Sequence, residues 1–464
     1  MLETQEERVS LESPEMDSFE CEREAIHLPG SIQPIGVLVA VAEPAFEVEQ
    51  ISANAQEWLG VEASAALGRT LEQVLGEGST EILRNAAIGT QLDDNPLYLG
   101  TVTVSTRPFQ MVAHRRNRVL VVELEPAGST EPASFRSIYS LVQSFLRQLA
   151  QQETVAKVAA LTTVEVRRLT GFDRVMVYRF DPDWNGAVIA EDRNDVLPSY
   201  LGLHFPAGDI PRQARELYRI NHLRQITDAN SVPVSLIGRK NSAALDLTHA
   251  SLRTVSPRHI EYMKNMGTMA SMSISILRDG ELWGLVTCHS ATPRAIPFET
   301  RTACEFVGQM LSLEITSAER RQYAARREQL KKHESRLLSH LAGVDHLAPA
   351  LASDKEDLLA CTGAAGAALV ENGECTLVGQ TPAEEEVLQV AEWLRATRPA
   401  DSVFATEALQ ADYSGAKSYA SIASGVLAVS LSRMQGSYLL WFRPEVAQTV
   451  RWAGELTGAP VLVS

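Results

Sequence analysis

The stretch Pro206-Ala207-Gly208-Asp209-Ile210-Pro211 places one acidic residue between two prolines. Each proline fixes its own φ angle and keeps the preceding residue out of the helical region, so Asp209 is expected on a stiff, extended backbone. Its carboxylate and its backbone carbonyl can therefore face the same site. Apolar residues follow at helical spacing over 212–218, which predicts a helix there. The simpler interpretation is that Asp209 is only the N-cap of this helix and Pro211 its first proline.

The most informative pattern of the sequence lies in residues 256–276. Ser256 and Pro257 open a helix as N-cap and first helical residue, and His259 and Tyr262 share one face of it. Residues 269–276 then alternate between small polar and apolar side chains, which predicts a strand with one face of hydroxyls. The hydroxyls of that face belong to Ser271, Ser273 and Ser275.

A hairpin is predicted to follow, because Asp279-Gly280 is a strong turn signal. The returning strand, 282–289, places four side chains on one face by alternation: Trp283, Leu285, Thr287 and His289. Upstream, we expect Tyr218 and Arg224 on one helix. Residues 227–254 form a long irregular excursion, of the kind that is usually functional or disordered in a compact domain.

Together these residues suit a large planar ligand with two acidic arms. Arg224 and Arg253 are the candidate arginines, and arginines with serine hydroxyls give charge-assisted hydrogen bonds to carboxylates. Tyrosines and His259 supply flat, partly polar walls. The plainer alternatives are that the serine row is exposed to solvent and that His259 is an ordinary surface or core histidine.

Cys21 stands alone at the start of the ordered part of the chain, before a loop over residues 22–36 and strands at 37–41, 101–104 and 118–124. Short strands with small helices between them indicate a small α+β sensor domain. As a thiolate, which Arg23 favours and the neighbouring glutamates oppose, Cys21 could form a thioether with an electrophilic ligand. The alternative is an incidental thiol.

The rest of the chain repeats an α+β pattern. Helices at 135–150 and 154–169 and strands at 173–180 and 186–190 begin a GAF-type domain, and residues 300–341 form one long helix. That helix is either a solvated linker or the seam of a homodimer. A hairpin around Asn372-Gly373, a helix at 383–396 and a strand at 426–430 form a second GAF-like pattern.

Bulk properties narrow the function classes. At 464 residues the chain has room for about three domains, and its net charge of −16 argues against a nucleic-acid surface as the main role. There is no apolar run of 18 residues and no apolar signal core at the N-terminus, so we expect no membrane span and a cytoplasmic protein. The five cysteines form no CxxC pair, which argues against a zinc site or a disulfide framework.

Several motifs resemble the bacteriophytochromes. The matching stretches are CEREAIHLPGSIQPIG at residue 21, FPAGDIP at 205, SPRHIEYMKNMGTMASMSIS at 256, LWGLVTCHSATP at 282, and SYLLWFRPE and VRWAG near the C-terminus. The resemblance implies an α+β PAS domain over residues 21–130 after a flexible tail (1–20), and a GAF chromophore-binding domain over 135–299. A linking helix (300–345) and a partial PHY domain (346–464) complete it. The N-terminal segment would thread through a lasso of the GAF domain, with Ile32 inside.

The same resemblance implies a role for each site residue. Cys21 would carry biliverdin, the carbonyl of Asp209 would accept from the pyrrole N–H groups, and His259 would pack over the ring system. The propionates would meet Arg224, Arg253, Tyr218, Ser271 and Ser273. His289 would bond the carbonyl of the terminal ring, whose pocket includes Tyr178, Phe205 and Tyr262, and Ile210, Pro211 and Ser256 would also line the chromophore.

At two positions the sequence differs from the family pattern, and each difference predicts a property of the chromophore site. Gly208 replaces a serine and loosens the backbone beside Asp209, while Arg258 stands where other branches have a cysteine, which favours attachment at Cys21 and biliverdin. The tongue of the PHY domain is expected to be incomplete and an output module to be absent.

The implied function is that of a red/far-red photoreceptor without enzymatic turnover, in which light-driven isomerisation of the bilin shifts Pr and Pfr states. A homodimer and a downstream output module or response regulator are the expected partners, and nucleic acid and membrane are not. The alternative from another class is a GAF/PAS ligand-binding or dimerisation module without photochemistry.

Overall fold

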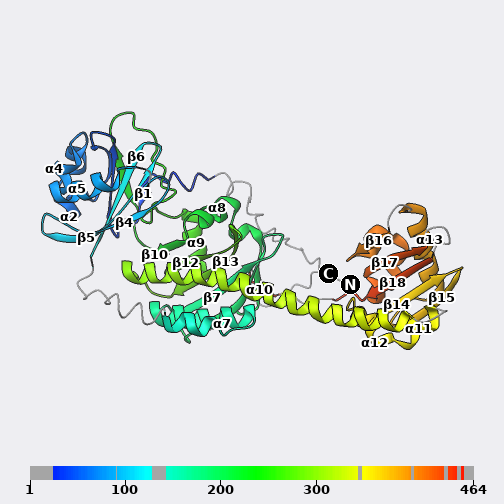
Figure 1. Ribbon diagram of the computed structural model, residues 1–464. Coiled ribbons are helices and arrows are strands. Elements are labelled where there is room, and N and C mark those ends of the chain that lie inside the picture. Colours follow the sequence, from blue (N-terminus) through cyan, green and yellow to red (C-terminus); the bar gives the residue numbers. More distant parts are fainter. Residues whose placement is uncertain are drawn as a thin grey trace, which may run out of the picture. The chain divides into compact units, whose positions relative to one another are not determined.

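The computed structural model describes residues 24–89, 91–127, 143–342, 347–398, 402–432, 437–446 and 451–453. These residues form two compact units. The chain passes from the first unit to the second between residues 318 and 319, and residues 451–453 belong to the first unit. Both units mix helices and strands, so the predicted α+β class is confirmed (Figure 1). The predicted tail, Cys21 and the first half of the helix predicted at 135–150 lie outside the described residues.

The first domain is built on a seven-stranded antiparallel sheet. In spatial order its strands are β1 (Ser31–Ile32), β11 (Val234–Gly238), β3 (Glu47–Ser52), β2 (Val37–Ala42), β6 (Val119–Pro126), β5 (Arg107–Arg116) and β4 (Leu97–Val104). Four short helices pack on it: α2 (Ala55–Leu59), α3 (Ala63–Ala66), α4 (Leu71–Leu75) and α5 (Glu77–Ala86). The sequence pattern predicts β2, β4 and β6. It misses β3 and β5, since their charged and polar residues obscure the apolar alternation.

The N-terminal strand β1 is enclosed by the excursion at residues 227–254. On one side Ile32 pairs with Val234 of β11, and on the other it bridges to Arg253. The Ile32 side chain is fully buried among residues of the excursion and of the first sheet. The predicted threading of the N-terminal segment is therefore confirmed, and the excursion is more regular than expected, because β11 joins the sheet of the first domain.

Ile32→Ala should weaken this threaded junction. The substitution removes a fully buried side chain from a cluster that includes Leu247 and Leu252, and such truncations typically cost about 2–5 kcal/mol. We expect a lower thermal midpoint of the first unit, measured by calorimetry. Ile88→Ala, at a side chain that is 73% exposed, is the matched control and should leave the midpoint unchanged. Equal midpoints for both variants would contradict the packing of Ile32.

The second domain surrounds another seven-stranded sheet. In spatial order its strands are β10 (Leu223–Ile226), β12 (Ala270–Arg278), β13 (Glu281–Ser290), β7 (Arg174–Phe180), β8 (Gly186–Arg193), β9 (Leu203–Phe205) and β19 (Arg451–Trp452). All neighbours are antiparallel except β19, which pairs in parallel with β9. One face packs on α7 (Val155–Thr170) and on the first half of α10 (Phe298–Leu341). The other face carries α8 (Arg212–Ile220) and α9 (Pro257–Asn265), and it is the face that matters for function.

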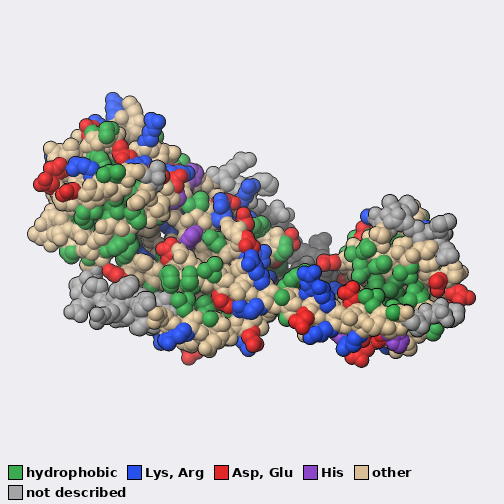
Figure 2. Space-filling view, in the orientation of Figure 1, with side chains coloured by type: hydrophobic (Ala, Val, Ile, Leu, Met, Phe, Trp, Pro, Cys, Tyr) green, Lys and Arg blue, Asp and Glu red, His purple; other side chains and the backbone are tan. Residues whose placement is uncertain are grey.

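Helix α10 continues from the first unit into the second, as the sequence predicts for residues 300–341. Its second half is exposed, and Figure 2 shows side chains of both charges along it. Lys332 and Glu328 form one i,i+4 ion pair there at 2.9 Å. Within the described ranges, no helix is both long and apolar enough to cross a membrane.

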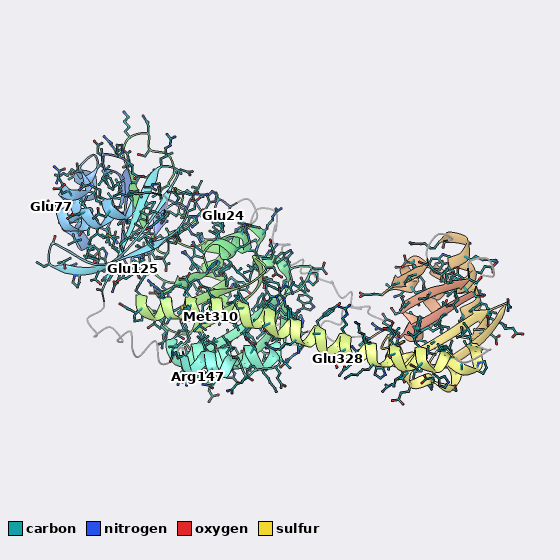
Figure 3. The ribbon with its side chains drawn as sticks, viewed as in Figure 1. Glu24, Glu77, Glu125, Arg147, Met310 and Glu328 are labelled. Atoms are coloured by element: carbon teal, nitrogen blue, oxygen red, sulfur yellow. The ribbon has the colours of Figure 1, made fainter. Side chains whose placement is uncertain are left out.

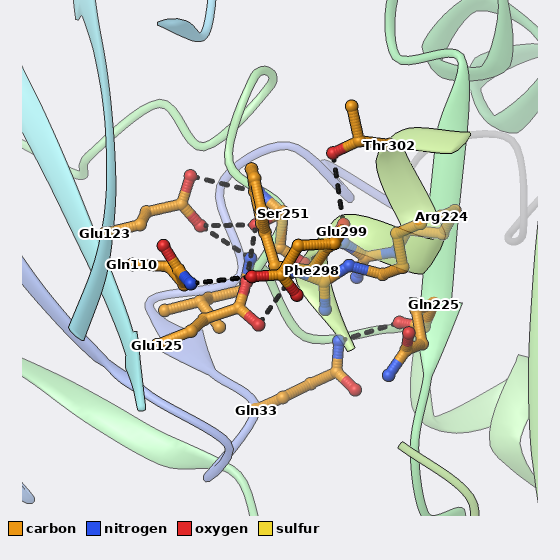
Figure 4. A network of polar contacts seen from close by, with 12 residues as sticks. Gln33, Gln110, Glu123, Glu125, Arg224, Gln225, Ser251, Phe298, Glu299 and Thr302 are labelled. Atoms are coloured by element: carbon orange, nitrogen blue, oxygen red, sulfur yellow. Dashed lines mark hydrogen bonds and ion pairs between the residues drawn. The ribbon is translucent and has the colours of Figure 1, made fainter. Parts of the chain in front are cut away.

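A polar network joins the first domain to the start of α10 and to the excursion (Figure 4). Arg301 on α10 donates two hydrogen bonds to Glu125 of β6, at 2.7 and 2.8 Å. Glu123, two residues earlier, accepts from the backbone N–H groups of Leu252 (2.6 Å) and Ser251 (3.1 Å) and from the Ser251 hydroxyl. The Ser251 carbonyl in turn accepts from Arg224 at 3.1 Å, so the network reaches the site described below.

Glu123 should make the stability of the first unit depend on pH. Burial raises its pKa from 4.5 to about 7, so the folded state holds a proton that the unfolded state releases. This contribution is complete below pH 4.5 and is lost as pH rises through 7, by about 3 kcal/mol in total. Glu123→Gln removes it, so the variant should gain stability relative to the parent between pH 5 and pH 8.

Thermal unfolding across this pH range measures the difference. Glu77→Gln, an exposed position on α5 (Figure 3), is the control and should follow the parent at every pH. A constant difference between the parent and Glu123→Gln would show that Glu123 does not titrate in this range.

The second unit is a five-stranded antiparallel sheet between two layers of helices. Its strands, in spatial order, are β15 (Glu374–Gly379), β14 (Gly366–Glu371), β18 (Ser437–Arg443), β17 (Gly425–Ser432) and β16 (Val403–Thr406). The end of α10 packs on one face with α11 (Leu347–Ser353) and α12 (Lys355–Ala360). The other face carries α13 (Glu384–Thr397), α14 (Leu409–Asp412) and α15 (Ala420–Ala423). The predicted hairpin turn at Asn372-Gly373 is confirmed, with φ angles of 53° and 82°.

Candidate functional site

Polar side chains gather on one face of the second sheet, where α8 and α9 lie. Antiparallel pairing aligns them in two rows across neighbouring strands, and paired residues project to the same side. We call this surface the site face. Its rows are Arg224–Ser273–Thr287 and Ser271–His289–Arg174.

The serines of β12 are buried, at 4–7% exposure for Ser271, Ser273 and Ser275. The alternative that they face solvent is therefore wrong. Helix α8 covers this part of the sheet, and the Ser275 hydroxyl donates to the carbonyl of Tyr218 on that helix at 2.6 Å. The predicted alternation on β12 is confirmed, because its apolar residues lie on the opposite face, in the core with α7 and α10.

One residue of the returning strand lies on the other side of the sheet. Trp283 packs in the core with Val286 and Cys288, whereas Leu285 belongs to the cluster of the site face. The register shifts beside Ile276, where Leu277 pairs with Leu282 and leaves Trp283 as the extra residue. This irregularity reverses the side of Trp283. The prediction that Trp283 shares a face with His289 is thus wrong.

Arg253 is buried, Arg224 is half-buried, and both have backbone partners. Arg224 donates to the carbonyls of Ser251 and Arg253, and Arg253 donates to the carbonyl of Ile26 at 2.7 Å. Among the described residues, neither arginine pairs with a carboxylate, and the Nε of Arg253 has no partner. Burial lowers the pKa of both, that of Arg253 to about 10. A buried cation beside a half-buried one, with no anion, is costly, so this side of the site favours an anionic ligand.

Arg224 reaches this position from a strand. Helix α8 ends at Ile220, after which Asn221 has an extended backbone and β10 begins at Leu223. The prediction that Tyr218 and Arg224 share a helix is therefore wrong. The physical reason is the sheet: β10 pairs with β12, and this tertiary pairing overrides the helical pattern.

Asp209 ends a 3₁₀ turn, Ala207–Asp209, that leads into α8. Its carboxylate accepts a hydrogen bond from the Tyr262 hydroxyl on α9 at 2.9 Å. Burial raises the pKa of Asp209, and the bond from Tyr262 partly offsets this rise. The N-cap position of α8 is Pro211, so the interpretation of Asp209 as N-cap is wrong. Arg215 donates to the carbonyls of Ala207 and Ile210, which fixes the backbone on both sides of Asp209.

Aromatic rings border Asp209 on the sheet side. Tyr178 of β7 contacts Phe205 with ring centroids 5.7 Å apart, and Phe205 contacts Tyr200 at 5.9 Å. The Tyr178 ring packs against the backbone of Gly186. A Cβ atom at that position would lie 1.7 Å from the ring carbon that bears the hydroxyl. Burial and the nearby Asp209 raise the pKa of Tyr178, so its hydroxyl stays protonated.

Two histidines complete the site. His259 on α9 lies 6.3 Å from Tyr262 between ring centroids, at an interplanar angle of 25°. Burial and Arg224 lower the pKa of His259 to about 4. His289 on β13 is buried, and burial with Arg174 and His259 lowers its pKa to about 3. Both imidazoles are therefore neutral near pH 7, and each offers one hydrogen-bond donor and one acceptor.

The remaining predicted residues lie around this core. Ile210 and Tyr218 pack, half-buried, against the aromatic cluster. Ser256 occupies the N-cap position of α9 as predicted, but its hydroxyl donates to Glu24 at 2.7 Å and does not cap the helix. Figure 3 shows Glu24 near these helices, at the start of the described chain. Cys21, three residues earlier in the sequence, lies outside the described residues.

Sequence reasoning missed one member of the site face, Arg174, whereas Thr287 lies on the same face as His289, as predicted. Arg174 is fully buried and hydrogen-bonds His289, and Thr287 has a buried hydroxyl without a partner among the described residues. A signal for Arg174 exists in the sequence. It alternates in phase with Met176 and Tyr178 on a strand whose next residues are apolar, which marks an inward-facing charge.

Three family models match the chain and define its class. The PAS fold matches residues 21–127, the GAF domain residues 154–318, and the phytochrome region residues 330–459. This arrangement is that of a PAS–GAF–PHY photosensory module.

Relatives and solved structures then give the family. Cyanobacterial phytochrome B of Nostoc sp. is 40% identical over 95% of this chain, and phytochrome-like protein Cph1 of Synechocystis sp. is 40% identical over 93%. The crystal structure of bacteriophytochrome RpBphP3 from R. palustris is similar with a TM-score of 0.81 and 38% identity, covering 94% of this chain and 88% of that one. The chain belongs to the phytochrome family, which confirms the predicted resemblance.

The similarity to the Stigmatella aurantiaca phytochrome photosensory core module is comparable, with a TM-score of 0.78, 40% identity, and coverage of 94% of this chain and 87% of that one. The chain spans 59% and 58% of the length of the two cyanobacterial relatives. The similarity therefore does not transfer the activity and partners of those longer proteins to this chain.

Proposed function

We propose that this chain is the sensory module of a red/far-red photoreceptor that holds biliverdin covalently through Cys21. The observation that carries this proposal is a pair of arginines, the half-buried Arg224 and the buried Arg253, which have no carboxylate partner among the described residues. A bilin has two propionates, and each would supply the missing anion. The unpartnered hydroxyl of Thr287 and the buried hydroxyls of Ser271 and Ser273 add hydrogen-bonding capacity on the same face.

The chain's own residues would divide the work. Arg224 and Arg253 hold the acidic arms, and Tyr178, Phe205 and Tyr262 form the aromatic wall. The thiolate of Cys21 would hold the pigment by adding to a vinyl carbon, with a C–S bond formed in place of the vinyl π bond and a proton from solvent taken up by the neighbouring carbon. Once bound, the pigment supplies light absorption and isomerisation of a double bond.

Signalling would follow from differential contacts in two states. A ligand shifts a two-state equilibrium only through contacts that differ between the states, and here His289, Asp209 and Tyr262 are candidates for those contacts. Helix α10, which runs from the first unit into the second, is a route to a downstream output module or response regulator. We propose a cytoplasmic homodimer with no enzymatic turnover of its own.

The test is to mix the purified chain with biliverdin and record absorption before and after red and then far-red light. Denaturing electrophoresis separates covalent from free pigment. We expect a covalent adduct whose red-absorbing state converts reversibly. An adduct that only bleaches would retain the binding part of the proposal and remove photoswitching, and the absence of any bound pigment would overturn the proposal in favour of a module without a chromophore.

A further inference from the structure

Arg174 and His289 face each other across two neighbouring strands of the site face. They are directly paired between β7 and β13, and the Nη2 of Arg174 lies 2.9 Å from the Nδ1 of His289. Both side chains are buried, and Arg174 has no measurable exposure. His289 belongs to the set of residues that the resemblance assigns to the chromophore, whereas Arg174 lies outside that set.

Arg174 is held in place at its other end. Its Nη1 donates to the carbonyl of Pro198 at 2.5 Å, and its guanidinium lies 3.7 Å from the ring centroid of Tyr200. In the described part of the chain it forms no ion pair with a carboxylate. The guanidinium therefore has a fixed orientation, and one of its N–H groups points at His289.

The chemistry of the two groups sets the direction of this hydrogen bond. A guanidinium has five donors and no acceptor, so the Nδ1 of His289 accepts. A neutral imidazole has its single hydrogen on the other nitrogen when Nδ1 accepts. Protonation of Nδ1 would also bring two cations into contact in a buried place. The charged groups that act on His289 are Arg174 on β7 and His259 on α9, and both disfavour an imidazolium.

We propose that Arg174 is a positioning residue that holds His289 as the Nε2–H tautomer, so that His289 can only donate to a bound ligand. The arrangement therefore selects a ligand with an acceptor oxygen at this place, such as the lactam carbonyl of a linear tetrapyrrole. The choice of ligand rests on the proposed function, whereas the tautomer itself does not.

The tautomer can be observed in the full chain with and without biliverdin. Nitrogen-15 labelling of the ten histidines, followed by NMR of the ring nitrogens, distinguishes a protonated nitrogen from a bare one. A His289→Gln variant assigns the signals by their disappearance. We expect a bare Nδ1 and a protonated Nε2 in the parent without pigment, with no change of tautomer when biliverdin binds. A protonated Nδ1 in the parent would overturn the proposal directly.

Variants of Arg174 test its part in this choice. Arg174→Lys keeps a cationic donor and should keep the Nε2–H form. Arg174→Met removes the donor, and loss of a hydrogen bond to a charged group should shift the tautomer ratio by about tenfold or more. Arg179→Met, on the same strand but exposed and lying over Trp283, is the matched control and should leave the ratio unchanged.

Circular dichroism shows whether each variant is folded, and the parent's NMR result decides the proposal even if Arg174→Met fails to fold. An unchanged ratio in a folded Arg174→Met variant would overturn the role of Arg174. If biliverdin does not bind at all while the apo chain has the Nε2–H form, the proposed function fails and the tautomer inference stands. In the pigmented chain, the absorption band of the Arg174→Met variant should depend on pH between 5 and 8. The absorption band of the parent should not.

Discussion

A Cys21→Ser chain mixed with biliverdin will carry no pigment through denaturation, whereas the parent chain will retain it. The loss should be complete, because a serine hydroxyl is not deprotonated near neutral pH and cannot replace the thiolate as nucleophile. Denaturing electrophoresis with detection of pigment absorption measures it.

The structure explains why no other cysteine should substitute. Cys288 and Cys304 are buried in the core of the second domain, and burial raises the pKa of both, that of Cys304 to about 12. The thiolate, which is the reactive form, is then scarce. Cys361 and Cys375 belong to the second unit, and burial also raises their pKa values.

The position of Cys21 along the chain supports the same expectation. It lies three residues before Glu24, whose carboxylate binds the Ser256 hydroxyl at the start of α9. That helix carries His259 and Tyr262. Cys361→Ser is the matched control and should retain covalent pigment. Pigment that stays attached to the Cys21→Ser chain would show that another residue forms the bond.

Much of the fold follows from local patterns that tertiary packing does not disturb. The serine alternation of β12, the Asp279-Gly280 turn and the long helix α10 are all present where the sequence predicts them. Each depends on a short-range rule: a period of two, a turn with positive φ angles, and sustained helical propensity.

The parts that sequence did not predict depend on contacts between distant segments. Strand β11 forms because it pairs with β1 and β3. These partners lie about 200 residues earlier in the chain, so no local sequence pattern indicates the pairing. Trp283 changes side because of one irregular pair, and Arg224 is on a strand because β12 is beside it. Arg174 was overlooked as a site residue because its partner, His289, is 115 positions away.

Arg224→Met should weaken the equilibrium binding of biliverdin by roughly 10- to 150-fold, the range for losing a hydrogen bond to a charged group. This affinity is measured in the Cys21→Ser background. Binding is reversible there because no covalent bond forms, so the fluorescence or absorption of the pigment reports a true dissociation constant. The substitution removes a half-buried cation that has no carboxylate partner in the described chain, so the lost affinity should not come from unfolding.

Two further measurements separate a lost ligand contact from a damaged fold. The thermal midpoint of the unpigmented Arg224→Met chain should lie within a few degrees of its parent, while the rise in midpoint on adding biliverdin should shrink in step with affinity. Arg219→Met is the matched control, since Arg219 is exposed on α8 and pairs with Glu216 at 3.2 Å. Unweakened binding by Arg224→Met would show that the ligand's acidic arms do not use this arginine, and it would remove the main support for an anionic ligand at the site face.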